Sequence, residues 1–306
     1  MTHIFSNPLF YKKRSGITEE IIHGVYYFYE SGQPAYGENF PVISSTLFNL
    51  LKFIALEIDV SFPGVMAAMA ARPGKDSRYF DIVKDMADLY QVKESDLICS
   101  RYRSENSEEL SRFYNPYALQ HVIVVGACKQ NGIDPDKYWE EDHPIQERIF
   151  SVVGKATSEP TSWCTGVSGL PAAITSAKTL LKVWSELSES GSPVVESFFS
   201  SLKQDPSSII QNNQFEYQVM AAFKGRLMVL SNDSGVFLVK SVDAGDKDFG
   251  FLVKFASNAD RKYAPYGLLA ALKNYPYENS LVLELRDYLE ARVSGAYQNG
   301  VEVSFP

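Results

Sequence analysis

The segment Phe40-Pro-Val-Ile-Ser-Ser-Thr-Leu-Phe-Asn49 marks the point where a strand-like hairpin passes into the first helical pattern of the chain. In the predicted helix, Ser45 and Phe48 lie three residues apart and therefore on one face. A serine hydroxyl is a weak nucleophile unless a nearby base removes its proton, and a phenylalanine ring cannot act as that base. The segment thus has the form of a catalytic serine helix whose base is missing.

Outward from this segment, the hydrophobic periodicity places strands toward both ends of the chain and helices between them. Strands from both ends can share one antiparallel sheet only if the helical middle forms an inserted or covering lobe. The sequence therefore predicts an α/β (α+β) fold, with an antiparallel sheet of N- and C-terminal strands covered by helices. The predicted strands are residues 20–30, 33–37, 225–230, 235–241 and 248–256, and the predicted helices are residues 45–58, 75–90, 114–131, 143–154, 171–189, 193–202, 259–273 and 280–292.

Several short motifs extend this interpretation along residues 18–274. They are Glu20-Ile-Ile-His-Gly-Val-Tyr-Tyr-Phe-Tyr29, Ala70-Ala-Arg-Pro-Gly-Lys-Asp76, Tyr138-Trp-Glu-Glu-Asp-His-Pro-Ile-Gln146, Gly166-Val-Ser-Gly-Leu-Pro171 and Ser231-Asn-Asp-Ser-Gly-Val-Phe237. In order and spacing they resemble segments of the bacterial asparaginase II family. The resemblance implies a serine β-lactamase/penicillin-binding-protein-like fold. It also implies a single domain over residues 1–306, with a sheet lobe at about 18–43 and 222–306 and a helical lobe at about 44–221.

The chain departs from that family where the family performs its chemistry. Phe48 stands at the position of the SxxK lysine, and Leu230 at that of a second lysine. The family positions that would line a metal-binding catalytic pocket, two cysteines and a lysine, fall on Tyr117, Gln120 and Ser168. Together these replacements argue against SxxK amide hydrolysis, a bound metal or any other cofactor.

The replacements give the inferred cleft an aromatic wall, formed by Phe48, Tyr114 and Tyr117. Such a wall favours an apolar or aromatic small molecule, held by stacking and oriented by hydrogen bonds. The expected ligand-binding residues are Ser45, Phe48, Tyr114, Asn115, Tyr117, Gln120 and Ser168, and the catalytic candidates are Ser45, Tyr117 and Asp233.

Structural roles compete with these assignments. A serine at a helix start commonly caps backbone N–H groups, as Ser45 would, and Phe48 has the character of a core residue. His121, on an apolar helix, is expected to be a hydrogen-bonded core histidine. Asp142 is expected to cap the helix that follows it, with proline in the first turn. Lys52 lies two helical turns beyond Ser45, about 10 Å away, and is expected to snorkel to the surface.

Three functions remain open. The first is a repurposed enzyme that binds a hydrophobic or aromatic small molecule and promotes a cyclisation, isomerisation or similar non-hydrolytic step, as in biosynthesis. The second is a pseudoenzyme that binds a metabolite or a protein partner without catalysis. The third is an asparaginase-like amidohydrolase whose base comes from another position, such as Lys75, Lys254 or Lys262.

Composition limits the partners. The formal net charge is -8 and no tract rich in lysine or arginine is present, so nucleic acid is not an expected partner. The most apolar stretch, residues 50–71, is interrupted by Lys52, Glu57 and Asp59, so no membrane span is expected. Three widely spaced cysteines fit a reduced, cytoplasmic chain better than a disulfide framework. The sequence leaves homo-oligomerisation open.

Overall fold

The computed structural model describes residues 8–14, 20–43, 45–58, 77–103, 108–158, 162–166, 168–204, 206, 214–231, 235–242, 248–257, 262–296 and 301–305. The chain divides into two compact units. Unit 1 consists of Met1–Val42, Ser176–Ser185 and Gln211–Pro306, and unit 2 of Ile43–Thr175 and Glu186–Ile210. The predicted Ala70–Asp76 motif and Asp233 lie outside the described residues.

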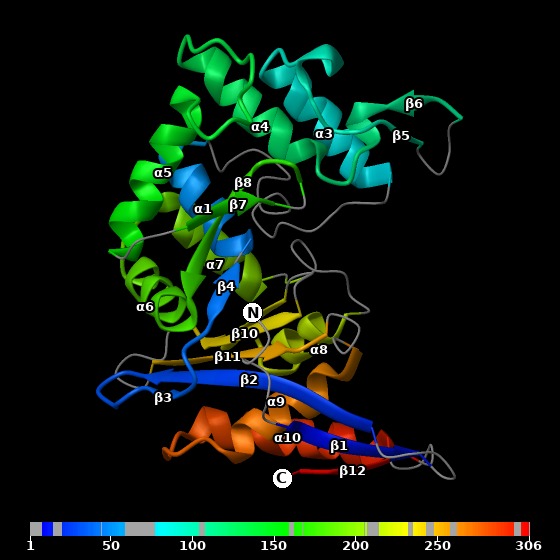
Figure 1. Ribbon diagram of the computed structural model, residues 1–306, viewed down its shortest axis with the longest axis vertical. Helices are drawn as coiled ribbons and strands as arrows, with labels where there is room; N and C mark the ends of the chain where they lie inside the picture. The colour runs from blue at the N-terminus through cyan, green and yellow to red at the C-terminus, as the bar shows by residue number, and fades with distance from the viewer. Residues whose placement is uncertain are drawn as a thin grey trace. The chain divides into compact units, whose positions relative to one another are not determined.

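Unit 1 is built on an antiparallel sheet that joins strands from both ends of the chain (Figure 1). The strand order is β12-β1-β2-β11-β10-β9, and β3 pairs with β2 beside this path. In the central pairing, Phe28 of β2 lies opposite Phe251 of β11. The strands are β1 (Pro8–Arg14), β2 (Glu20–Glu30), β3 (Tyr36–Gly37), β9 (Leu227–Ser231), β10 (Val236–Ser241), β11 (Phe249–Phe255) and β12 (Val301–Ser304).

Helices pack on this sheet through small and apolar residues. Among the described residues of this unit, the helices are α8 (Phe215–Ala222), α9 (Ala264–Lys273), α10 (Ser280–Ala296) and most of α6 (Ala177–Ser188). Helix α9 contacts β1, β11 and α10. At Gly267 of α9, an added Cβ atom would lie 2.3 Å from Cζ of Phe255. The close approach of α9 to β11 therefore requires glycine at this position.

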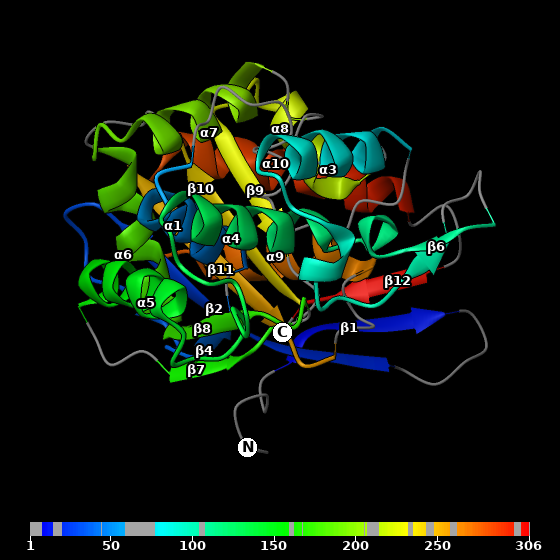
Figure 2. The same cartoon turned by 90° about the horizontal axis from the view of Figure 1, so that it is seen from above.

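Unit 2 is mainly helical. In the part of unit 2 that the structure describes, the helices are α1 (Ser45–Ala55), α3 (Ser77–Leu89), α4 (Ala118–Gln130), α5 (Pro144–Thr157) and α7 (Pro193–Gln204), with the 3-10 turns η1 (Glu94–Asp96) and η2 (Arg112–Tyr114). The short pairs β5 (Tyr102–Arg103) with β6 (Leu110–Ser111) and β7 (Ser162–Thr165) with β8 (Pro171–Ser176) are antiparallel. Strand β4 (Pro41–Ile43) spans the division between the units in the chain. Figure 2 shows α3 alongside α4 and α5 beside α1.

Helix α4 forms the centre of unit 2. All residues from Ala118 to Cys128 are buried, so the helix is covered on every side. A helix that is apolar all round, as Val122-Ile-Val-Val125 indicates, is stable in water only in such a position. Two polar side chains of α4, those of Gln120 and His121, therefore lie in the protein interior.

The structure confirms a mixed α/β fold with antiparallel sheets, and it corrects several predicted elements. Residues 171–176, predicted as helix, form β8, and the helix begins at Ala177. Strand β8 pairs with β7, and this tertiary contact overrides the helical tendency of its alanines. Strands β1 and β12 and helix α8 were not predicted. None of the helices in the described part of the chain is long and apolar enough to cross a bilayer.

Candidate functional site

Helix α1 begins at Ser45, as predicted, but the described part of the structure does not include the Ser45 side chain. Phe48 is 4% exposed and packs edge-on against Trp163 of β7, with ring centroids 5.9 Å apart. Trp163 in turn stacks on Phe150 of α5 at 3.7 Å. Phe48 therefore belongs to an aromatic cluster of unit 2, defined here as Phe48, Phe150 and Trp163.

Lys52 does not snorkel to the surface, and the prediction that it would was wrong. Its side chain is 2% exposed, and all the residues from 47 to 53 of α1 are buried. Its Nζ atom lies 5.1 Å from the ring centroid of Phe48. Burial lowers the pKa of Lys52 from 10.5 to about 8, since the interior disfavours the charged ammonium.

His121 is the hydrogen-bonded core histidine that the sequence predicted. It is fully buried, with Nδ1 2.6 Å from Oη of Tyr138 and Nε2 2.8 Å from the backbone oxygen of Ser168. A carbonyl oxygen can only accept, so Nε2 carries the proton and Nδ1 accepts from the Tyr138 hydroxyl. Tyr138 also accepts from the backbone N–H of Ile98 at 3.2 Å.

This network holds His121 in its neutral form. Burial is the main cause that lowers its pKa to about 4; the Ser168 carbonyl opposes the shift, and the charge on Lys52 adds to it. Both ring nitrogens are occupied, so His121 is not available as a general base in this arrangement. Its hydrogen bond to the backbone oxygen of Ser168 connects the Gly166–Pro171 loop to α4.

Asn115 is also committed to the local fold. Its Nδ2 donates to the backbone oxygen of Ser100 at 2.9 Å, and its Oδ1 accepts from the backbone N–H of Tyr117 at 2.8 Å. The second bond positions Tyr117 as the N-cap residue of α4. Tyr114 and Tyr117 are partly exposed, and the Tyr114 ring packs edge-on against Phe80 at 5.2 Å.

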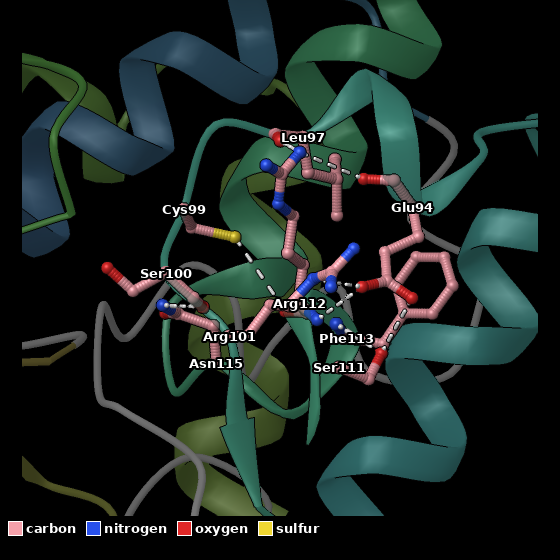
Figure 3. Close-up of polar contacts among 9 residues, drawn as sticks. All are labelled: Glu94, Leu97, Cys99, Ser100, Arg101, Ser111, Arg112, Phe113 and Asn115. Carbon is pink, nitrogen blue, oxygen red and sulfur yellow. Dashed lines mark hydrogen bonds and ion pairs between the residues drawn. The ribbon is translucent and has the colours of Figure 1, made fainter. Parts of the chain in front are cut away.

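A cluster of polar contacts lies just before Tyr114 and Asn115 in the chain and is centred on Glu94 and Arg112 (Figure 3). The carboxylate of Glu94 accepts from Oγ of Ser111 and the backbone N–H of Arg112, both at 3.1 Å, and lies 3.2 Å from Nε of Arg101. The Arg112 guanidinium donates to the backbone oxygen of Leu97. These contacts join residues 94–101 to Ser111 and Arg112, so the cluster holds together the chain segments that precede α4.

The remaining predicted residues differ in exposure. Gln120 is 8% exposed, whereas Ser168 is partly exposed and its Oγ accepts from the backbone N–H of Leu170 at 3.4 Å. Leu230 is a buried residue of β9. The structure thus brings Ser168 to His121 and Asn115 to Tyr117. A common pocket for Ser45, Tyr117 and Ser168 stays a prediction.

The predicted cap of α5 needs a correction. The N-cap is His143, not Asp142, and the Nδ1 atom of His143 accepts from the backbone N–H of Ile145 at 3.2 Å. Its Nε2 therefore carries a proton and donates to the backbone oxygen of Asp134 at 2.9 Å. Pro144 occupies the first helical turn as predicted. An imidazole replaces the expected carboxylate because it reaches both backbone groups at once.

The donor set does not fit the metal that the family resemblance implies. At the three corresponding positions the side chains are a phenol, an amide and a hydroxyl, and both nitrogens of the adjacent His121 are already bonded. Zinc sites need several N, S or O donors with free lone pairs, often thiolates. In the described part of the chain no three His, Cys, Asp or Glu side chains gather as a metal site.

The family assignment follows from the sequence of the region that contains α4 and the Gly166–Pro171 loop. A model of the L-asparaginase II family matches residues 64–303, more than three quarters of the chain. The chain belongs to the L-asparaginase II family. No curated protein matches it. Of the candidate site residues, Tyr117, His121 and Ser168 lie inside the matched region. Helix α1, which carries Ser45, Phe48 and Lys52, precedes it.

Sequence reasoning missed two features of this L-asparaginase II member. Trp163 received no role, although Ser-Trp-Cys between turn residues is compatible with a short strand. Lys52 was placed at the surface, although the apolar residues on both sides of it, Leu50-Leu51 and Phe53-Ile54, indicated a helix buried all round.

Proposed function

We propose that this L-asparaginase II family protein binds a hydrophobic or aromatic small molecule and promotes a non-hydrolytic step such as a cyclisation or isomerisation. The observation that carries the proposal is the position of Phe48, packed on Trp163 three residues after Ser45, where a serine hydrolase of the SxxK type needs a base. The nearby His121 does not fill that role, since both its nitrogens are bonded.

The surroundings also favour an apolar ligand. Trp163 and Phe150 are partly exposed, as are Tyr114 and Tyr117 near the start of α4. Partly exposed rings offer surface for stacking, and burial of that surface stabilises a complex by about 25 cal/mol per Å². The phenol groups would orient the ligand through hydrogen bonds. The strand order of unit 1, with N- and C-terminal strands side by side, supports a serine β-lactamase-like architecture as part of this proposal.

The first test measures ammonia release from asparagine and glutamine by the purified protein. We expect none above background, because no base adjoins Ser45 in the way SxxK chemistry requires. Release that scales with protein and is abolished by Ser45→Ala would replace the proposal with amide hydrolysis. Lys254 would then be the first base to examine, because burial lowers its pKa.

The second test searches for the ligand by native mass spectrometry and by a thermal-shift screen of aromatic metabolites. Tyr117→Phe removes one hydroxyl from the expected site and should weaken binding, whereas Tyr102→Phe alters an exposed residue of β5 and should not. Binding without conversion of any ligand would favour the pseudoenzyme. Tight binding of asparagine or aspartate alone would contradict the proposal.

A further inference from the structure

We propose that Lys52 is an anion-binding residue, and that the small molecule bound beside it is an aromatic or apolar acid with a single carboxylate. The inference rests on the proposed function and names its substrate class. It starts from a side chain to which neither the family match nor the motifs assign a role.

Among the residues that the structure describes, no carboxylate pairs with the ammonium of Lys52. Within α1 itself, Lys52 is the only ionisable residue. Helices α5 and α7 contact α1 in unit 2, and the residues that these two helices bury are uncharged: Ile145, Gln146, Ile149, Val153 and Thr157 on α5, and Val194, Val195, Phe198, Phe199 and Leu202 on α7.

A buried charge without a partner is unfavourable, and proteins normally pair it or neutralise it. The ring of Phe48, at 5.1 Å from Nζ, compensates only in part through its negative face. His121 contributes no negative charge, because it is neutral and both its nitrogens are bonded. An anionic group on a ligand would supply the missing charge.

The same surroundings select the kind of anion. Lys52 offers a single positive charge and lacks the planar, bidentate donor group of an arginine. One of the two negative charges of a phosphate would therefore have no partner. The aromatic cluster of Phe48, Phe150 and Trp163 lies around the same helix and offers ring surface to the rest of the ligand. One carboxylate on an aromatic or apolar body therefore matches both features.

The test is calorimetric binding of three acids, benzoate, phenylacetate and 3-phenylpropionate, each compared with its neutral amide. We expect at least one acid to bind more tightly than its amide at pH 6.5. With the pKa of Lys52 at about 8, affinity for the acid should fall roughly 30-fold between pH 6.5 and 9.5, whereas affinity for the amide should not change. His121, with a pKa of about 4, stays neutral across this range.

Variants separate the charge from the fold. Lys52→Met should abolish the preference for acid over amide, Lys52→Arg should retain part of it, and Lys155→Met, at an exposed position of α5, should leave it unchanged. An amide that binds as well as its acid would overturn the anion-binding role of Lys52 while leaving an aromatic ligand in place. Failure of all six compounds to bind would overturn the acid proposal, and failure of the wider aromatic screen would overturn the proposed function itself.

Discussion

Replacement of Lys52 by methionine should stabilise the protein at neutral pH. The methionine side chain has a similar length and no charge to desolvate, so it fits the apolar surroundings of α1. Burial lowers the pKa of Lys52 from 10.5 to about 8, and this difference corresponds to about 3 kcal/mol of unfavourable free energy in the folded state when the amine is charged. We expect Lys52→Met to recover up to that amount.

The pH dependence gives a sharper form of this prediction. Between pH 8 and 10.5 the unfolded chain keeps the proton on Lys52 while the folded chain has lost it. The unfolded state therefore binds more protons in this window, and the free energy of unfolding rises with pH. Below pH 8 both states are protonated and the penalty is fully present. Lys52→Met should remove this rise.

Urea unfolding of both proteins at several pH values from 7 to 10.5 measures the effect, with the slope against urea checked for constancy. Lys155→Met serves as the control, because its exposed amine should leave the profile of the wild-type protein unchanged. Parallel profiles for the wild-type protein and Lys52→Met, or a loss of stability at pH 7 in the variant, would show that the lysine is not desolvated as described.

Three further perturbations test other parts of the structure. His121→Leu removes the hydrogen bonds to Tyr138 and Ser168 and should cost about 2–4 kcal/mol of stability. The pKa of His121 is about 4 in the folded protein against 6.5 ordinarily, so the wild-type protein should lose stability as pH falls from 6.5 to 4. The variant should lose less stability in that range, as followed by urea unfolding. Gly267→Ala should destabilise by about 1–3 kcal/mol through the clash with Phe255, an effect that an unchanged midpoint of urea unfolding would exclude. Asp248→Asn removes the negative charge that pairs with the ammonium of buried Lys240 and should cost about 3 kcal/mol in thermal or chemical unfolding. Asp85→Asn on the exposed face of α3 should have no effect.

Much of the fold was predictable because its strands carry a strong local signal. Residues 20–30 are rich in β-branched and aromatic side chains, and the structure confirms them as β2 with the same bounds. Strand β8 was not predictable in the same way. Its alanines favour a helix locally, and pairing with β4 and β7, on either side of it, makes it a strand.

For the candidate site, the burial of His121 could be predicted from the sequence, but the burial of Lys52 and the hydrogen-bond partners of Asn115 could not. His121 in the core follows from the apolar residues around it, and the structure confirms it. For Lys52 two rules conflict. A lysine usually reaches solvent, whereas the apolar residues on both sides of it indicate a buried helix, and the packing of the neighbouring helices decides for burial. The hydrogen bonds of Asn115 likewise depend on Ser100, a partner that no spacing rule identifies.

The pairing of β2 with β11 has a consequence for synthesis on the ribosome. Phe28 pairs with Phe251, which is synthesised about 220 residues later, so this part of the sheet cannot form until then. During that delay the aromatic run Tyr26-Tyr-Phe-Tyr29 is an unpaired strand edge, the kind of segment that aggregates. Residues 43–175 and 186–210, which make up unit 2, leave the ribosome in that interval. The protein should therefore be more sensitive to chaperone supply and growth temperature during expression than its stability after purification suggests.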